Sequence, residues 1–505
     1  MVTKIKSGAL AGIDGLDVRV EVDISRGLPG FHLVGLPGAE VRESRQRVLA
    51  ALRNSGVGLP TGKITVNLAP AGLRKEGASF DLAIAMGVMA TREGPLNDRC
   101  LQGDQAPLFL GELSLSGRLQ PVRGLLAMVS AAAARGDSLV VVPACQAWEA
   151  RLVRGVRVVA AGNLAEVVHW WRTGEEPPRA GRAENPVALP DRPEKPVMAH
   201  LQGQPALAKA AVVAAAGRHN ILLVGPPGTG KTRLARLLGA CQPPLERAEA
   251  LAITRIHSAA GTLAEGCLVA RRPFRAPHHS ITRAGLVGGG AGLAPGEVTL
   301  AHGGLLFLDE LAEFAPSVLD SLREPLEDGR ITLARGSGRR TYPADFQLVG
   351  AMNPCRCGYL GSGVRDCRCS VSERRRYLSR LSGPLLDRID LFVQVPEWEG
   401  AFLEGETADP VPAPGADWRQ LVTTGAWPFL AARCAGKPLL PLDVEARRHL
   451  EAVRQPLGLS LRSVGACRRV ASTMARLDQE PKVRRRHILE ALEFRLENLG
   501  LEAVG

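Results

Sequence analysis

This 505-residue sequence lacks any long apolar run. A membrane-spanning helix needs about 18 or more consecutive apolar residues, and no stretch of this kind is present. The opening segment, MVTKIKSGALAGIDG, also lacks the uninterrupted apolar core of a signal peptide. We therefore expect a cytoplasmic protein with no membrane partner.

A disulfide framework is missing as well. Six of the ten cysteines are scattered singly along the chain, at Cys100, Cys145, Cys241, Cys267, Cys434 and Cys467. Such scattering is typical of a reducing compartment, where disulfides do not persist. The composition gives no sign of disorder either, because 45% of the residues are hydrophobic and 23% are charged.

Positive charge is present in excess, with a formal net charge of +12. Clustered Lys and Arg side chains favour polyanionic partners because they displace counterions from phosphates. The alternative is that most basic side chains balance acidic ones and the others only solvate the surface. Charge is therefore compatible with a nucleic-acid partner but does not establish one.

The length and the pattern of the chain predict several domains with an α/β fold. Residues 1–171 alternate strand-like and helix-like segments, which predicts an α/β domain. Residues 172–196 are rich in Pro, Gly and charge and predict a linker. Residues 197–396 predict a parallel sheet with helical crossovers. A connector at 397–439 leads to a small, basic helical domain at 440–505.

A phosphate-binding loop follows the strand-like segment ILLVG. GPPGTGKT fits G-x-x-x-x-G-K-[ST] and leads into the helical segment TRLARLLGA. Such a loop closes backbone amides around phosphate at a helix N-terminus. We therefore predict ATP binding, with Lys231 on the β- and γ-phosphates and the Thr232 hydroxyl on Mg²⁺. The loop consists of Gly225, Pro226, Pro227, Gly228, Thr229, Gly230, Lys231 and Thr232.

Polar residues end the next two strand-like segments. LLFLDE ends in Asp309 and Glu310, of which Asp309 is expected to hold Mg²⁺ and Glu310 to polarise the attacking water. Two acids can also be a solvated strand end, but a nearby phosphate loop favours the catalytic interpretation. FQLVGAMN ends in Asn353, which is placed to contact the γ-phosphate or to orient water.

Four cysteines outside the scattered set lie close together. They are Cys355, Cys357, Cys367 and Cys369, in the loop 355–369. Four thiolates from one loop can close a tetrahedral Zn²⁺ site, and a Gly- and Arg-rich loop with little core gains rigidity from a metal. The alternatives are free structural thiols, or redox-labile cysteines whose pKa Arg356 and Arg368 lower.

Longer segments carry a family resemblance. Between residues 272 and 395 the chain contains, in order, RPFRAPHHSITRAGLVGGG, PGEVTLAHGGLLFLDELAEF, REPLEDGRI, AMNPCRCGYLG and SGPLLDRIDL. These resemble the ComM (YifB) family of bacterial competence-related proteins, which are magnesium-chelatase-like AAA+ proteins. LPGFHLVGLPGAEVRESRQRVLAALRNSG and KITVNLAPAGLRKEGASFDLAIA extend the resemblance to the N-terminal domain, so that it spans essentially the whole chain.

The resemblance implies a homo-hexameric ring that binds single-stranded or branched DNA. It implies ATP-driven helicase or branch-migration activity in homologous recombination, which integrates DNA during natural transformation. It also implies a sensor role for Asn353, a finger role for Arg388 in the neighbouring subunit's site, and a sensor role for Arg462 in its own subunit. A surface ion pair is the plainer interpretation of either arginine.

Basic side chains also gather in the hairpin-like segment RITLARGSGRRTY, as Arg330, Arg335, Arg339 and Arg340. In a ring these arginines can face the channel and bind a DNA backbone without reading its sequence, although a solvated basic loop is the alternative. The preceding insertion, 267–297, contains His278 and His279. For these two histidines we expect a structural or surface role rather than metal ligation.

The N-terminal domain resembles the proteolytic domain of Lon. Ser79 occupies the position of the Lon nucleophile, but Leu126 stands where Lon has its general-base lysine. A serine without a base is a poor nucleophile, so we predict a non-proteolytic domain.

A second class of function is a chelatase-type or chaperone-like ATPase that remodels a protein partner. It shares the nucleotide core, so the motifs above do not separate it from a DNA motor. The sequence contains no metal-dependent adhesion motif such as D-x-S-x-S, which disfavours a chelatase. A chaperone-like ATPase would respond to a protein rather than to DNA.

Overall fold

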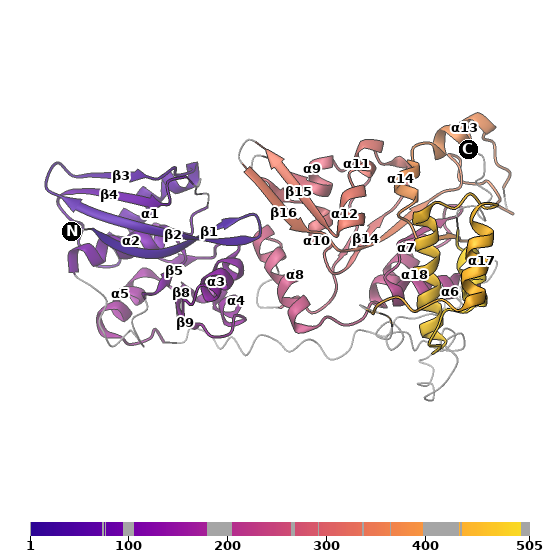
Figure 1. The fold of residues 1–505 in the computed structure, drawn as a ribbon. Coiled ribbons are helices and arrows are strands. Elements are labelled where there is room, and N and C mark those ends of the chain that lie inside the picture. Colours follow the sequence, from indigo (N-terminus) through magenta and orange to yellow (C-terminus); the bar gives the residue numbers. More distant parts are fainter. Residues whose placement is uncertain are drawn as a thin grey trace, which may run out of the picture. The chain divides into compact units, whose positions relative to one another are not determined.

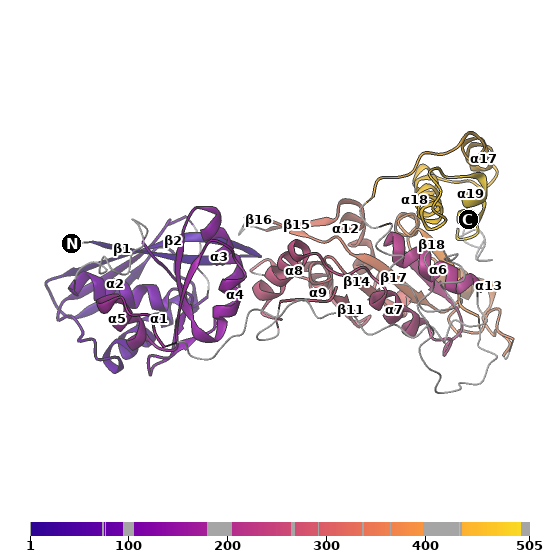
Figure 2. The same cartoon turned by 90° about the horizontal axis from the view of Figure 1, so that it is seen from below.

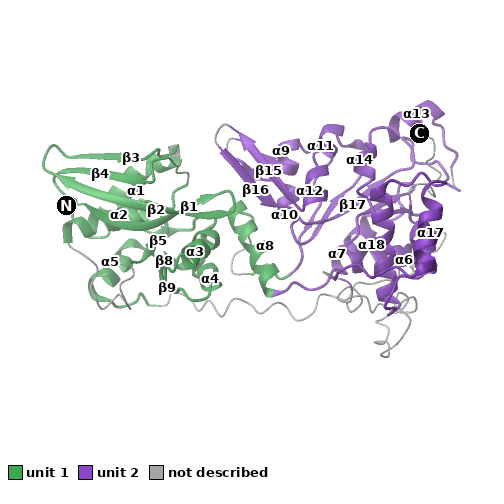
Figure 3. Cartoon of the chain, in the orientation of Figure 1, with its two compact units in different colours: residues 1–191, 247–270 green, residues 192–246, 271–505 purple. Residues whose placement is uncertain are grey.

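The computed structural model describes residues 2–72, 75, 77–93, 106–178, 205–263, 268–290, 292–335, 338–363, 365–396, 434 and 437–495. The chain divides into two compact units, which Figure 3 shows in different colours. The first comprises residues 1–191 and 247–270, and the second comprises residues 192–246 and 271–505. In the described ranges, no helix combines the length and apolar character needed to cross a membrane.

The first unit is built on a seven-stranded sheet with the order β3-β4-β2-β1-β5-β8-β9 (Figure 1). β2 pairs antiparallel with β1 and β4, and the other neighbours are parallel. In β4 every second residue is buried, as expected for a strand with one face on a core. The strands are β1 (Thr3–Ala11), β2 (Asp14–Ser25), β3 (Gly30–Val34), β4 (Lys63–Ala69), β5 (Leu108–Phe109), β8 (Leu139–Pro143) and β9 (Arg157–Ala161).

Helices complete the core of this unit, together with a ribbon of β6 (Glu112–Leu113) and β7 (Leu119–Gln120). α2 is buried continuously from Asp81 to Ala90 because it packs against the sheet strands β1 and β2. The helices are α1 (Ala39–Asn54), α2 (Asp81–Glu93), α3 (Leu125–Ala134), α4 (Ala147–Arg151), α5 (Leu164–Thr173) and α8 (Arg247–Ala260).

The position of α8 differs from the predicted domain boundary. The sequence places residues 247–260 in the ATPase domain, but the helix belongs to the first unit. Buried polar contacts hold it there: Ser258 Oγ donates to the Glu149 carboxylate at 2.7 Å, and Gly124 N–H donates to the Ser258 carbonyl at 3.1 Å. Burial raises the pKa of Glu149, and the hydrogen bond from Ser258 opposes this shift. Helical periodicity shows which face of a helix is apolar, but not which domain that face covers.

The second unit contains a five-stranded sheet with the order β11-β14-β17-β10-β18, in which all pairs are parallel. The central strands are continuously apolar and buried, as parallel strands are when both faces are covered. The predicted parallel sheet is therefore confirmed. Its strands are β10 (Ile221–Val224), β11 (Phe274–Arg275), β14 (Leu305–Leu308), β17 (Gln347–Met352) and β18 (Leu391–Gln394).

Two small antiparallel hairpins lie beside each other in this unit. β15 (Arg330–Arg335) pairs with β16 (Gly338–Pro343), which confirms the predicted hairpin; Figure 2 shows these two strands side by side. β12 (Gly288–Gly289) pairs with β13 (Ala294–Pro295). The buried Tyr342 hydroxyl of β16 donates to the Leu293 carbonyl and joins the two hairpins.

Further helices complete the second unit, and those within residues 440–505 form the predicted C-terminal helical region. Buried side chains of α18 pack with those of α6, and the His219 ring is within 2.8 Å of the Thr473 hydroxyl. Most of the predicted connector, 397–433, lies outside the described residues. The helices are α6 (Pro205–Gly217), α7 (Lys231–Ala240), α9 (Arg283–Val287), α10 (Glu297–Leu300), α11 (Pro316–Asp320), α12 (Arg323–Asp328), α13 (Val371–Leu378), α14 (Gly383–Leu386), α17 (Val444–Arg454), α18 (Leu461–Leu477) and α19 (Arg485–Leu492).

Replacing Asp81 by Ala will destabilise the first unit by about 3 kcal/mol, because it leaves a partly buried Arg47 without its partner. Asp81 is fully buried, its carboxylate lies 2.6 Å from Arg47 Nε, and it accepts the Leu113 N–H at 3.2 Å. Hydrogen exchange, measured peptide by peptide on the full chain, will report the free energy of opening. The control is Asp17→Ala, whose exposed carboxylate makes only long ion pairs and whose loss will change that free energy by less than about 0.5 kcal/mol. Equal effects of the two changes would contradict the prediction.

Candidate active site

The carboxyl ends of three neighbouring parallel strands bring the predicted residues together. The register pairs Val224 of β10 with Met352 of β17, and Leu308 of β14 with Gly350 of β17. The phosphate loop follows β10, the acidic pair follows β14, and Asn353 follows β17. They therefore meet at one edge of the sheet, which is where ligands bind in open parallel sheets.

Glycine is required at three positions of the phosphate loop. A β-carbon on Gly225 would lie 2.2 Å from the Val395 carbonyl oxygen, closer than any side chain tolerates. Gly228 and Gly230 have φ values of +82°, in the left-handed region that glycine adopts without strain. α7 begins directly after Gly230, so the loop opens onto a helix N-terminus.

Lys231 lies over this loop and contacts the predicted sensor. Its ammonium donates to the carbonyls of Gly225 and Pro226, both at 2.7 Å, and to Asn353 Oδ1 at 3.2 Å. Burial lowers the pKa of Lys231, and the Asp309 carboxylate opposes this shift. The cation thus has only neutral partners, and a phosphate group would replace carbonyl oxygens with charged ones.

Thr232 and Asp309, the two predicted magnesium ligands, lie in contact with each other. The Thr232 hydroxyl donates to Asp309 Oδ2 at 2.8 Å, so both oxygens already face one point. Mg²⁺ prefers such hard oxygen ligands, together with waters and substrate phosphates. The donor set therefore fits this ion, which would neutralise charge on a bound triphosphate.

Glu310 adopts an unusual backbone conformation and has a histidine partner. Its φ is +51°, a strained value for a residue with a side chain, and such strain often marks functional positions. Its carboxylate lies 3.3 Å from Nδ1 of His279, and the His279 ring packs at a tilt against the His278 ring, with 4.0 Å between the ring centroids. The imidazole thereby orients the carboxylate that is expected to polarise water.

The strand register explains this contact, which the sequence alone did not reveal. β11 pairs with β14 so that Phe274 lies opposite Leu305 and Arg275 opposite Leu306. Continued beyond the strand ends, the same register places His279 beside Glu310. Because β11 has only two residues, its pairing partner could not be identified from hydrophobic periodicity.

The two arginines predicted as finger and sensor converge on one carboxylate. Arg388 and Arg462 both donate to Glu327 on α12, Arg462 at 2.7 Å from Oε1. The hydrogen bond from Arg388, followed by that from Arg462, lowers the pKa of the Glu327 carboxyl. The segment REPLEDGRI contains Glu327, but its two arginine partners could not be identified from the sequence, because three segments far apart in the chain meet at this carboxylate.

The four clustered cysteines converge around one point. Their sulfur atoms all lie within 4.8 Å of one another. Backbone N–H groups, chiefly that of Tyr359, lower the pKa of Cys357 to about 6, whereas burial raises the pKa of Cys355 to about 12. A set of four converging sulfurs fits a thiophilic metal ion.

The hairpin arginines are accessible. Arg330, Arg335 and Arg339 are exposed and Arg340 is half-buried. Within the described ranges, none of the four forms an ion pair with a carboxylate. The hairpin therefore presents uncompensated positive charge to solvent.

Ser79 of the first unit is not poised for attack on a substrate. It is 6% exposed, and its hydroxyl donates to the Gly8 carbonyl at 3.0 Å. Leu126 is fully buried.

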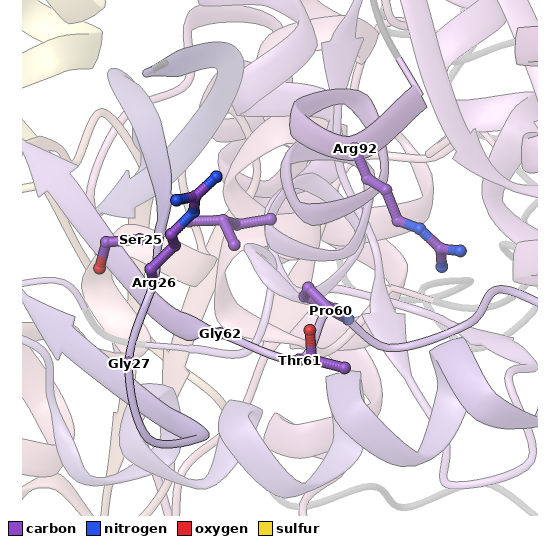
Figure 4. Close-up of a pocket in the computed structure, with 8 residues that line it drawn as sticks. Ser25, Arg26, Gly27, Pro60, Thr61, Gly62 and Arg92 are labelled. Carbon is purple, nitrogen blue, oxygen red and sulfur yellow. The ribbon is translucent and has the colours of Figure 1, made fainter.

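A separate surface pocket of the first unit contains none of the predicted site residues (Figure 4). Two cations reach it from different elements, Arg92 from α2 and Arg26 from the segment after β2. Its lining consists of Ile24, Ser25, Arg26, Gly27, Pro60, Thr61, Gly62 and Arg92.

Comparison with known families defines the class of protein. Residues 197–403 match the family model "Magnesium chelatase, subunit ChlI", which includes the active-site edge described above. Residues 20–146 match "Subunit ChlI of Mg-chelatase", and residues 433–495 match "Magnesium chelatase, subunit ChlI C-terminal". Fold and site are thus those of a magnesium-chelatase-like AAA+ protein.

Individual relatives narrow this class to a family. The chain is 47% identical over 412 residues to an uncharacterized protein of Mycobacterium tuberculosis, covering 80% of each chain. It is 38% identical over 504 residues to YifB of Escherichia coli, covering 97% of this chain and 96% of YifB. It is also 38% identical over 500 residues to competence protein ComM of Haemophilus influenzae, covering 97% of each. The chain therefore belongs to the ComM (YifB) family.

Replacing His279 by Ala will lower the turnover number for ATP about tenfold while leaving ATP affinity nearly unchanged, because the imidazole contacts Glu310, whose proposed role is to polarise water rather than to bind the nucleotide. Steady-state hydrolysis and titration with a fluorescent ATP analogue will separate the two effects. Glu310→Gln gives the reference for complete loss of the base, at about 10²-fold or more. His279→Asn keeps a polar partner for Glu310 and will recover part of the activity. The control is His169→Ala, because His169 is an exposed histidine of the first unit beside Glu175 rather than Glu310; wild-type turnover in His279→Ala would contradict the prediction.

Proposed function

We propose that this protein hydrolyses ATP with Mg²⁺ and uses the energy to move along DNA. The observation that carries the hydrolysis is the convergence of Lys231, Thr232, Asp309 and Asn353 at one sheet edge. Lys231 binds the β- and γ-phosphates, Thr232 and Asp309 hold Mg²⁺, and Asn353 contacts the γ-phosphate. Glu310 polarises the attacking water.

DNA is the proposed partner because the hairpin β15–β16 presents arginines without carboxylate partners, as described above. Backbone phosphates of single-stranded or branched DNA would supply the missing anions. The relative named competence protein ComM supports a competence-related role. We accordingly propose helicase or branch-migration activity in homologous recombination, acting in the cytoplasm to integrate DNA during natural transformation.

The proposed working form is a homo-hexameric ring. In the ring, Arg388 leaves Glu327 and enters the site of the neighbouring subunit, where it stabilises charge on the transferred phosphoryl group. Arg462 acts as a sensor within its own subunit. This arrangement makes hydrolysis depend on assembly, because one subunit alone has an incomplete site.

Each region has a proposed task. Residues 1–171 form a non-proteolytic scaffold, 172–196 a linker, 197–396 the ATPase core, 397–439 a connector, and 440–505 a helical lid. A structural Zn²⁺ ion in the cysteine cluster completes the proposed cofactors. A chelatase-type or chaperone-like ATPase acting on a protein partner is the competing function, which the following experiment distinguishes.

Single-stranded or forked DNA will raise the ATPase rate several-fold, because DNA in the channel couples to the nucleotide site. The rate is measured with and without each DNA, and Lys231→Ala serves as the blank because it lacks the phosphate-binding cation. Basal hydrolysis with no response to any DNA would reject the DNA motor and favour a protein partner.

Replacing both Arg339 and Arg340 by Ala will weaken binding to single-stranded DNA and reduce the slope of log K against log salt by about 1.4, since each of the two lost phosphate contacts contributes about 0.7. Fluorescence anisotropy at several salt concentrations measures the slope, and basal ATP hydrolysis will stay unchanged. Arg448→Ala, an exposed arginine on α17, removes one charge away from the hairpin. An unchanged slope in the double variant would remove the hairpin from the DNA interface.

A further inference from the structure

The cysteine cluster has the dimensions of an occupied tetrahedral site. Four sulfurs at about 2.3 Å from a Zn²⁺ ion lie about 3.8 Å from one another. In this protein the Cys355 sulfur lies 3.4 Å from the Cys357 sulfur and 3.6 Å from the Cys367 sulfur. The sulfurs of Cys357 and Cys367 are 3.6 Å apart. All four sulfurs, including that of Cys369, lie within 4.8 Å of one another. Three of the six sulfur–sulfur distances are thus close to those of a tetrahedral zinc site.

Backbone N–H groups also face the cluster. N–H groups of Tyr359 and Arg368 point to the sulfur of Cys357, as outer partners of metal-bound sulfur do. Arg374, on α13, donates from Nε to the Cys369 carbonyl at 3.1 Å and fixes the far end of the loop. The loop is short of apolar contacts, since Cys355 is its only fully buried cysteine. Cross-linking through a metal would therefore supply rigidity that packing does not.

This loop touches the nucleotide site directly. Cys355 follows Asn353 by two residues, so the first ligand is joined to the sensor by a very short piece of chain. Gly358, between the second ligand and Tyr359, has a φ of +87°. A β-carbon there would lie 2.8 Å from Cδ of Pro227 and 3.8 Å from Cγ of Asn353. Gly358 of the cysteine loop thus lies against both the phosphate loop and Asn353.

We propose that Cys355, Cys357, Cys367 and Cys369 bind Zn²⁺, and that the closed loop holds Asn353 and Pro227 in position for ATP hydrolysis. The metal takes no part in the chemical step, because thiolates fill all four of its coordination positions. Its effect is on the orientation of Asn353, which makes the cysteines positioning residues. This second part of the proposal rests on the proposed ATPase function.

Metal analysis tests the first part. Protein expressed with zinc will contain one Zn²⁺ per chain by mass spectrometry of metals, and the Cys357→Ser and Cys367→Ser variants will contain far less. Cys145→Ser, which changes an exposed cysteine of the first unit, will retain the metal. Replacement by Co²⁺ will give the intense visible absorption of a tetrahedral thiolate site. Zinc-replete wild-type protein without bound metal would overturn the metal site.

Kinetics on metal-depleted protein test the coupling. A chelator such as 1,10-phenanthroline removes Zn²⁺ and is then removed by desalting, so that Mg²⁺ can be supplied separately. Turnover without DNA will fall about tenfold, as expected for a displaced polar group near the γ-phosphate, while the KM for ATP changes less. Added Zn²⁺ will restore the turnover number, and added Mg²⁺ alone will not. Unchanged turnover after zinc loss would overturn the coupling.

A double-mutant cycle shows whether the effect passes through the sensor. If the loop acts by placing Asn353, then Cys367→Ser combined with Asn353→Ala will be no slower than Asn353→Ala alone. If the two substitutions lower turnover by factors that multiply, the loop does not act through Asn353. Circular dichroism melts verify that the variants are folded. If wild-type protein hydrolyses ATP no faster than Lys231→Ala, the ATPase function fails and the coupling with it, while the metal analysis still decides the zinc site.

Discussion

The parallel alignment of β14, β17 and β10 is the constraint on which the second unit depends. Backbone hydrogen bonds fix the register of these strands to a single residue, and buried apolar side chains prevent slippage because every slip would move a core face. Each strand ends in a different polar group, so one alignment places a cation, a carboxylate and an amide within reach of one phosphate chain. Chemistry at this edge is thus a consequence of how three apolar strands pack.

Some of this arrangement was predictable from the sequence. The phosphate loop has a spacing that few other structures use, and Asp309 and Asn353 directly follow apolar strands, so their meeting at one edge follows from parallel topology. The magnesium pair, Thr232 with Asp309, is likewise a consequence of the two motifs. Here local pattern and global fold point to the same answer.

Other contacts were not predictable because they depend on tertiary structure. His279 reaches Glu310 through a two-residue edge strand, too short to leave a periodic signal. Glu327 lies within the segment REPLEDGRI, but that segment does not show that Arg388 and Arg462 reach it. The boundary of the first unit was also missed, since α8 is distant in sequence from the sheet it joins and is held by the buried Ser258–Glu149 pair. Each case needs the position of segments far apart in the chain.

Glu327 has a further consequence for the free subunit. One exposed carboxylate pairs with two guanidinium groups, so any other anion that binds either arginine must compete with Glu327. The competitor must offer more negative charge than a carboxylate, as a triphosphate does and a second carboxylate does not. The ion pairs with Glu327 therefore determine which anions can bind the two arginines. A weakly charged neighbour leaves both arginines on Glu327, and only a strongly anionic neighbour displaces them.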